Sequence, residues 1–214
     1  MKQQENQNGF LKIIATLLGI IFHPLFLPFY TVVLYFYVSP RFFLKQNIYP
    51  LEFYLIIVSI LIPLLFLITL KYAGVFSGFV LKLPKERLFF SVIMLSVYFI
   101  IIKKMMSFHI FIELMPFFIG IFLALLCLAV YNFYNRKPSL HAMGFGGVLG
   151  FFLIWGYYSQ LSIFWLLVTL ILTGTIVIAS RIYLQAHSLK EIFKGLIIGL
   201  VMQFVSFVVM YYWG

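Results

Sequence analysis

The amino-acid sequence predicts an all-α fold, a polytopic bundle of six to seven transmembrane helices that forms one integral membrane domain over residues 1–214. Hydrophobic residues make up 64% of the chain and charged residues 9%, whereas about 25% charged residues is usual for a water-soluble domain. One transmembrane helix needs about 20 apolar residues, so this composition fills six or seven crossings and leaves no room for a soluble domain. A water-soluble enzyme and a disordered chain are both excluded.

Seven apolar segments account for the predicted helices. They span residues 10–38, 51–72, 88–102, 108–134, 142–158, 161–179 and 192–213. His23-Pro24 and Pro28 interrupt the first segment, and proline inside a helix removes a hydrogen bond, so we expect a kinked or broken helix there. Pairs of glycines with the small-xxx-small spacing of closely packed transmembrane helices occur three times. They are Gly74/Gly78, Gly146/Gly150 and Gly195/Gly199.

The composition also limits the chemistry. The five acidic residues are all Glu, too few to build the clustered-carboxylate Mg²⁺ sites of membrane transferases. A single cysteine, Cys127, excludes an internal disulfide and a cysteine-based zinc site, so neither a metal nor another cofactor is expected. The net charge of +10 suits anionic lipid headgroups or an anionic substrate. Nucleic acid is excluded as a partner because no soluble basic domain is available to bind it.

Counting the crossings places three polar stretches on one membrane face. Starting from the face that holds the N-terminus, the chain returns to it at residues 73–87, 135–141 and 180–191. These stretches hold Lys82, Lys85, Arg87, Arg136, Lys137, Ser139, His141, Arg181, His187 and Glu191. We therefore expect their side chains to gather at one end of the bundle.

The third stretch carries the pattern most typical of catalysis. His187 and Glu191 are four residues apart and share a helix face, so the carboxylate can accept a hydrogen bond from the imidazole. Such a partner fixes the tautomer and stabilises the imidazolium, which suits a nucleophile or base. Arg181 adds a planar, permanent charge whose geometry fits phosphate oxygens. The alternative is a helix-start cluster at the membrane interface.

The other stretches are open to two readings. Residues 136–141 place a hydroxyl, a histidine and two cations before a helix N-terminus, which suits phosphate, although Ser139 can also be an ordinary cap. Residues 82–87 set three cations around one Glu, and the alternative is a solvated loop. His109 and Glu113 are expected to form an interfacial pair, with a proton relay as the alternative. His23 is expected to hydrogen-bond to backbone groups left unpaired at the kink, or alternatively to line a substrate groove.

Taken together, the three stretches resemble the type 2 phosphatidic acid phosphatase superfamily, which includes bacterial lipid phosphatases. The third motif of that superfamily is Ser-Arg, five residues, His, three residues, Asp. Ser180-Arg181, His187 and Glu191 match it, with Glu in place of Asp. The second motif, Pro-Ser-Gly-His, is matched by residues 138–141, with Leu140 in place of Gly.

The first motif of the superfamily is Lys, six residues, Arg-Pro. Arg87 matches the arginine, Leu88 stands at the proline position and Val80 at the lysine position, so Lys82 or Lys85 is expected to supply the missing charge. The resemblance covers residues 82–210, which would form the catalytic core of the domain.

The resemblance implies a residue set. His187 would be the nucleophile, Glu191 the residue that orients it, and His141 the general acid. The phosphate would be held by Arg181, Arg87, Lys82 or Lys85, Ser139 and the backbone N–H of Leu140. Phosphoryl transfer depends mainly on positioning and charge neutralisation, so these cations can replace Mg²⁺.

The expected function is therefore a metal-independent membrane phosphatase that acts through a phosphohistidine on a polyprenyl diphosphate, a phosphatidate-type lipid or a lipid A phosphate. The alternative is a non-catalytic lipid-binding or transport protein with a degenerate site of the same fold. The expected location is a bacterial inner membrane. The positive-inside rule favours the cytoplasmic face for the polar stretches, whereas the resemblance favours the opposite face, so the orientation stays open.

Overall fold

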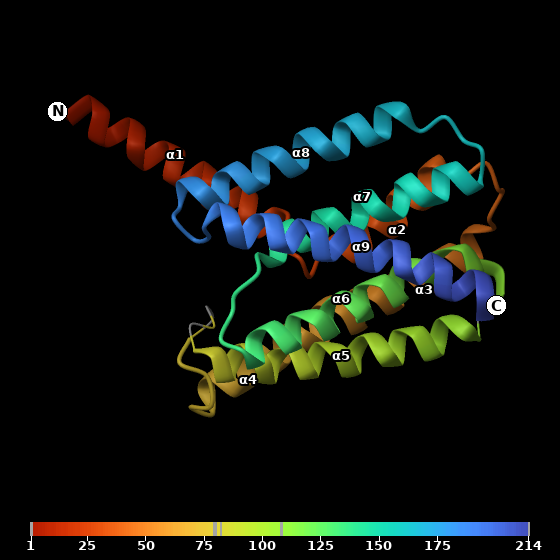
Figure 1. Cartoon of the computed structure of the whole chain (residues 1–214), viewed down its shortest axis with the longest axis horizontal. Coiled ribbons are helices and arrows are strands. Elements are labelled where there is room, and N and C mark those ends of the chain that lie inside the picture. Colours follow the sequence, from red (N-terminus) through yellow and green to blue (C-terminus); the bar gives the residue numbers. More distant parts are fainter. Residues whose placement is uncertain (1, 79–80, 82, 108, 214) are drawn as a thin grey trace.

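The computed structural model describes the backbone of residues 2–78, 81, 83–107 and 109–213, and the side chains of 9–78, 81, 83–107 and 111–212. Every regular element in these ranges is helical (Figure 1). The first half of the chain forms α1 (Lys2–Ile21), α2 (Leu27–Val38), α3 (Lys45–Leu55), the π-helix η1 (Ile56–Leu61), α4 (Ile62–Tyr72) and α5 (Pro84–Met106). The second half forms the 3₁₀ helix η2 (His109–Leu114), α6 (Met115–Phe133), α7 (Leu140–Tyr158), α8 (Phe164–Tyr183) and α9 (Leu189–Trp213).

Six helical stretches are long and apolar enough to cross a membrane. They are Lys45–Tyr72, Pro84–Met106, Phe111–Phe133, Leu140–Tyr158, Phe164–Tyr183 and Leu189–Tyr212. The apolar part of α1, Gly9–Ile21, and α2 are shorter, and together they form the first apolar segment. The predicted all-α, polytopic transmembrane bundle is confirmed.

The first apolar segment is a broken helix, as its prolines predicted. α1 ends at Ile21 and α2 begins at Leu27, with His23-Pro24 in the break. Inside the break, Nδ1 of His23 accepts a hydrogen bond from the backbone N–H of Leu25 at 3.3 Å. Pro28 lies in the first turn of α2, where a missing N–H costs little.

The stretch Lys45–Tyr72 is continuous although it contains two prolines. Its central π-helix, η1, ends just before Pro63, and the N–H of Ile62 bonds to the carbonyl of Ile57 five residues earlier. This wider turn accommodates the position at which Pro63 has no N–H to donate. The helix therefore crosses the bundle without a break.

α7 and α9 form the closest helix pair, and glycines create it. A Cβ on Gly146 would overlap the backbone of Leu196 on α9, and one on Gly199 would overlap the carbonyl of Met143 on α7. A Cβ on Gly195 would likewise meet the carbonyl of Ser139. Close packing at these spaced glycines was predicted and is confirmed. At Gly74 the prediction is wrong, because this residue has open space around it and a φ of +75° in the turn that ends α4.

The polar stretches lie at one end of the bundle, as the count of crossings predicted. The turns after α4, α6 and α8 share that end in Figure 1, together with the break between α1 and α2. We call it the histidine end and include in it Arg87, residues 134–141 and residues 180–191. The opposite end holds the turn between α7 and α8 and the C-terminus (Figure 1).

Candidate active site at the histidine end

The α7–α9 packing joins the second and third polar stretches. Ser139 is buried at the N-cap of α7, where its Oγ accepts a hydrogen bond from the N–H of Ala142 at 3.5 Å. Its own backbone N–H donates to the carbonyl of Glu191 at 3.0 Å. The contact at Ala142 shows that Ser139 caps its helix, which is the ordinary role considered for it.

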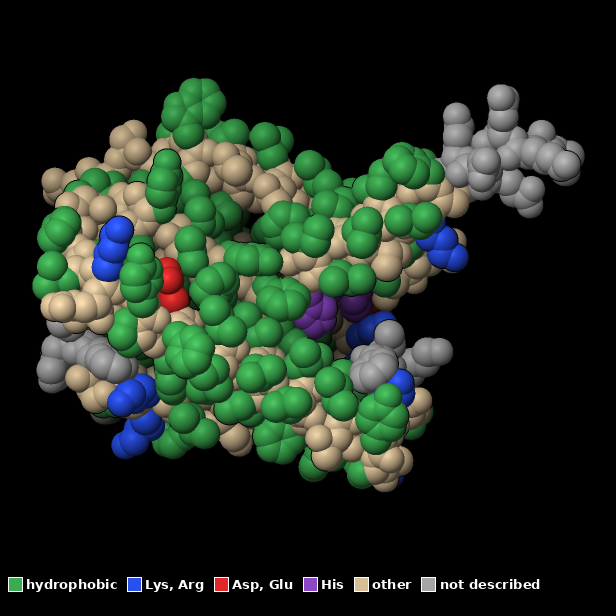
Figure 2. Space-filling view, turned by 180° about the vertical axis from the view of Figure 1, so that it is seen from behind, with side chains coloured by type: hydrophobic (Ala, Val, Ile, Leu, Met, Phe, Trp, Pro, Cys, Tyr) green, Lys and Arg blue, Asp and Glu red, His purple; other side chains and the backbone are tan. Residues whose placement is uncertain are grey.

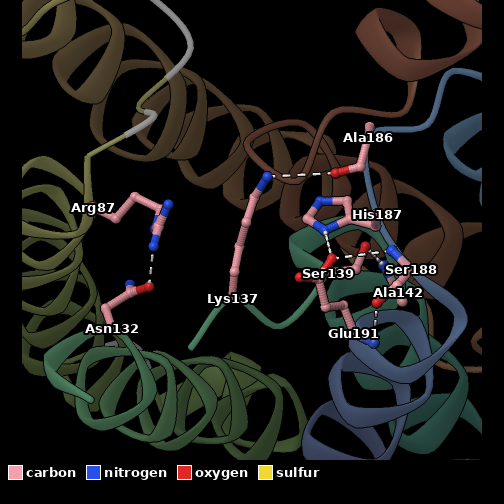
Figure 3. Close-up of polar contacts among 9 residues, drawn as sticks. All are labelled: Arg87, Asn132, Lys137, Ser139, Ala142, Ala186, His187, Ser188 and Glu191. Atoms are coloured by element: carbon pink, nitrogen blue, oxygen red, sulfur yellow. Dashed lines mark hydrogen bonds and ion pairs between the residues drawn. The ribbon is translucent and has the colours of Figure 1, made fainter. Parts of the chain in front are cut away.

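His187 and Glu191 form the hydrogen bond that their spacing predicted. Nδ1 of His187 lies 3.1 Å from Oε2 of Glu191 (Figure 3). The same oxygen accepts the N–H of Ser188 at 3.1 Å, and Oγ of Ser188 accepts the N–H of Glu191 at 3.4 Å. This reciprocal pair is a capping box that starts α9. It holds the carboxylate in place against the imidazole.

The hydrogen bond to Glu191 determines which nitrogen of His187 is available for chemistry. A carboxylate only accepts hydrogen bonds, so Nδ1 carries the proton and the lone pair of the neutral ring lies on Nε2. Burial lowers the pKa of His187; the hydrogen bond to Glu191 raises it, and the charges of Lys137 and Arg181 lower it, with a net fall below the ordinary value. A neutral imidazole with a free Nε2 is a competent nucleophile at neutral pH.

His141 lies buried at the start of α7, within electrostatic reach of His187 and Arg181. Its Nε2 is 3.1 Å from the backbone carbonyl of Gly19 in α1. The ring also packs edge-on against that of His23, with centroids 5.6 Å apart and an interplanar angle of 88°. His23 and His141, which are far apart in the sequence, therefore contact each other at the histidine end, and His187 lies within electrostatic reach of His141.

Arg181 lies between α8 and α1. Its Nη2 donates to the carbonyl of Ala15 at 2.5 Å, and its Nε donates to Oγ of Ser180 at 3.3 Å. A Cβ on Gly19 would overlap this guanidinium group, so α1 can approach only because residue 19 is glycine. An arginine has five N–H donors, and these two contacts leave others able to bind an oxyanion.

The first polar stretch contributes Arg87. Its Nε donates to Oδ1 of Asn132 at 3.4 Å, and Nδ2 of Asn132 donates to Oγ of Ser91 at 3.0 Å. In Figure 3, Lys137 lies between Arg87 and His187, and its Nζ donates to the carbonyl of Ala186 at 3.4 Å. Cationic side chains from α5 and from the turn before α7 thus border the same region.

The other expected phosphate ligands have different positions. Lys82 and Val80 lie outside the described residues. Lys85 is exposed on the first turn of α5. Leu140 is 38% exposed at the first position of α7, where the N–H has no carbonyl partner within the helix. Glu86 is buried and accepts hydrogen bonds from the N–H of Ser77 at 2.6 Å and of Leu83 at 3.4 Å, so it fixes the turn before α5.

The surface at this end is hollowed. Figure 2 shows histidine side chains in a notch beside Lys and Arg side chains. Lys137 and Arg181 add positive charge next to His187, and Glu191 is already bonded to His187. In the part of the chain that the structure describes, no group of three His, Cys or acidic side chains is arranged to hold a metal ion. The excess of cations favours an anionic ligand.

Glu113 belongs to a second polar cluster at the opposite end of the bundle. Its carboxylate pairs with Arg41 at 2.7 Å and accepts hydrogen bonds from Tyr35 at 2.8 Å and from Nε1 of Trp155 at 3.1 Å. We call these four residues the Glu113 cluster. It borders a cavity of about 450 Å³. The side chain of His109, the expected partner of Glu113, lies outside the described residues.

Sequence reasoning missed the part that α1 plays in the site. The carbonyls of Ala15 and Gly19 bind Arg181 and His141, and no side-chain pattern reveals the partner of a backbone oxygen. His23 carried a signal, since a His-Pro pair inside an apolar segment is unusual, but its contact with His141 depends on the fold. Comparisons with protein-family models, curated proteins and solved structures find no match for the chain.

Proposed function

We propose that this chain is a metal-independent membrane phosphatase that hydrolyses a lipid phosphate or diphosphate through a phosphohistidine intermediate. The observation that carries the proposal is the hydrogen bond between His187 and Glu191, which leaves the lone pair of the neutral ring on Nε2, within electrostatic reach of His141, Lys137 and Arg181. The resemblance to the type 2 phosphatidic acid phosphatase superfamily supports the same reaction.

In the proposed reaction, Nε2 of His187 donates its electron pair to phosphorus. The bond from phosphorus to the leaving oxygen breaks, and that oxygen takes a proton from His141. Glu191 stabilises the positive charge that develops on His187. Water then attacks the phosphohistidine, His141 accepts a proton from it, and phosphate leaves. The other product is the lipid alcohol or, from a diphosphate, the lipid monophosphate.

The phosphoryl oxygens would bind Arg181, Arg87, the Leu140 N–H and Ser139, with Lys82 or Lys85 as the lysine of the first motif. Lys137 also borders this region. Because these groups lie at helix ends, a lipid headgroup can reach them while its tails stay in the bilayer. Candidate substrates are polyprenyl diphosphates, phosphatidate-type lipids and lipid A phosphates, and the proposed location is a bacterial inner membrane.

A non-catalytic lipid-binding or transport protein is the second candidate. Leu140 stands where the superfamily has glycine, and a backbone N–H that approaches phosphate is least hindered without a side chain. Arg181 and His141 are also both bonded to the backbone of α1. If these contacts with α1 keep Arg181 and His141 away from the phosphate, the protein can bind a lipid headgroup without hydrolysing it.

An assay of phosphate release separates the two candidates. The purified protein in detergent and EDTA is given phosphatidate and a polyprenyl diphosphate, beside the His187→Ala variant and a His109→Ala control from the opposite end of the bundle. We expect His187→Ala to lower kcat by at least about 10³-fold and His109→Ala to leave it within about twofold. Lipid binding without turnover in the wild type would favour the binding protein.

The membrane face of the site can be found by labelling. Single cysteines are introduced at Gly78, near the histidine end, and at Gln160, in the turn between α7 and α8, in a Cys127→Ser background. An impermeant maleimide applied to intact cells then labels the residue that faces outward. Labelling of the cysteine at 78 would place the histidine end outside the cytoplasm, and labelling at 160 would place it inside.

A further inference from the structure

The break between α1 and α2 brings two groups against His141. Gly19 lies in the last turn of α1, where its carbonyl would normally accept the N–H of His23. That N–H instead bonds to the carbonyl of Ile20 at 3.2 Å, and Nε2 of His141 lies 3.1 Å from the Gly19 oxygen. A carbonyl only accepts, so Nε2 of His141 carries a proton. The end of α1 thereby fixes one nitrogen of the ring.

His23 fixes the plane of the same ring. Its own Nδ1 accepts the Leu25 N–H at 3.3 Å, which places the proton of the neutral ring on Nε2. Burial lowers the pKa of His23, and the charge of Arg181 lowers it further, so the ring is neutral at physiological pH. A neutral ring can pack edge-on against His141 without charge repulsion.

We propose that His23, with the carbonyl of Gly19, is a positioning residue that holds His141 so that its Nδ1 faces the leaving oxygen of the substrate. Each imidazole is then held through one nitrogen, but in a different protonation state: His187 attacks as the neutral ring, whereas His141 gives its proton as the imidazolium, with one proton on Nε2 at the Gly19 carbonyl and the other on Nδ1. Glu191 holds Nδ1 of His187 and exposes Nε2, whereas Gly19 holds Nε2 of His141 and exposes Nδ1. The role of His23 in turnover rests on the proposed function.

Two substitutions separate this role from a role in the chain break. His23→Asn can still accept the Leu25 N–H, as an Asn side chain does two residues before such a donor, but it lacks the ring. His23→Phe keeps a ring of similar size but has no acceptor. If the ring positions His141, His23→Asn lowers kcat roughly 10- to 100-fold with little change in KM, and His23→Phe retains most of the activity.

If His23 only stabilises the break between α1 and α2, the order of the two variants reverses. His23→Asn is then the active variant, and His23→Phe unfolds more easily. That result would overturn the proposal. The alkaline limb of the pH–kcat profile is the second kinetic readout, because it reports the group that gives the proton. It moves in His23→Asn if His23 acts on His141. The charged and titratable neighbours that remain in that variant are Arg181 and His187.

A measurement without substrate keeps this test independent of the phosphatase proposal. The protein has four histidines, so the ring signals of a ¹⁵N-histidine-labelled sample in micelles can be assigned with His141→Gln. We expect the titration of the His141 signal to move by roughly half a pH unit or more in His23→Asn. If the titration of the His141 signal is the same in His23→Asn as in the wild type, His23 does not act on His141 and the proposal is wrong. A wild type that hydrolyses no lipid phosphate overturns the phosphatase, while the titration still decides the coupling.

Discussion

The two ends of the bundle both carry polar clusters, but they differ in how their charges are balanced. In the Glu113 cluster, one carboxylate is matched by Arg41 and completed by hydrogen bonds from Tyr35 and Trp155. At the histidine end, Glu191 is bonded to His187, and the cations Arg181 and Lys137 bond to backbone carbonyl oxygens.

We infer that this difference separates a cluster that stabilises the fold from an end of the bundle that can bind an anion. A balanced ion pair with its hydrogen bonds completed has little to offer a further charged ligand, and it fixes the elements that supply it. Cations that bond to neutral oxygens keep their net charge, so a phosphate can bind them and neutralise it. On this view, stability depends on both ends of the bundle, whereas activity depends on the histidine end alone.

The largest effect on stability is expected where α7 and α9 touch. A Cβ on Gly199 would overlap the carbonyl of Met143, a backbone atom that cannot move aside, whereas Gly147 on α7 has open space around it. Gly199→Ala should lower the free energy of unfolding by about 1–3 kcal/mol, and Gly147→Ala should not lower it. Unfolding in mixed micelles, followed by tryptophan fluorescence, measures both.

The same pair of variants tests how the histidine end is assembled. Glu191 and Ser139 are joined across the α7–α9 contact by a backbone hydrogen bond, so phosphatase activity should fall with stability in Gly199→Ala. Equal stability of the two alanine variants would show that the glycine contact does not hold the helices together.

A smaller effect on stability is expected from Glu113→Gln. The amide can still accept hydrogen bonds from Tyr35 and Trp155 but no longer pairs with Arg41, whose side chain is 57% exposed. Because that exposure screens the charge, we expect a loss of about 1 kcal/mol in the free energy of unfolding and no change in kcat. A fall in kcat as large as that of His187→Ala would place the function at the Glu113 cluster instead.

Most of the fold could be predicted because its determinants are local. Apolar runs give the spans, the His23-Pro24 pair gives the break, and the spaced glycines of α7 and α9 give the close contact. The His187–Glu191 bond belongs to the same group, since helical periodicity alone brings residues four apart together. These features need no knowledge of the tertiary arrangement.

The parts of the site that could not be predicted join distant segments through groups that every residue has. The bond from His141 to the carbonyl of Gly19 spans more than half of the chain, and that from Arg181 to the carbonyl of Ala15 spans more still. A backbone oxygen leaves no trace in the sequence. The pairing of Arg41 with Glu113 likewise depends on where the turn after α2 lies against η2.

The smallest effect on stability at neutral pH is expected from Glu191→Gln, the counterpart of Glu113→Gln at the histidine end. The amide keeps the shape and can still accept the Nδ1 proton of His187, but it removes the charge that favours the imidazolium. Burial already lowers the pKa of His187, and the bond to Glu191 partly offsets this, so the variant should have a still lower pKa. The acid limb of the pH–kcat profile then moves to lower pH, and kcat falls because the cation is less stabilised.

The same shift changes how stability depends on pH. When the folded pKa of a histidine lies below the unfolded one, the unfolded state binds more protons between the two values, so stability falls as pH drops below about 6.5. Glu191→Gln widens that interval and should increase the total loss of stability at acid pH by less than about 1.4 kcal/mol, the equivalent of one pKa unit. Glu113→Gln should leave the ¹⁵N titration of His187 unchanged, because the Glu113 cluster lies at the opposite end of the bundle. An equal shift in both variants would mean that the His187 titration follows the overall charge of the protein and not its bond to Glu191.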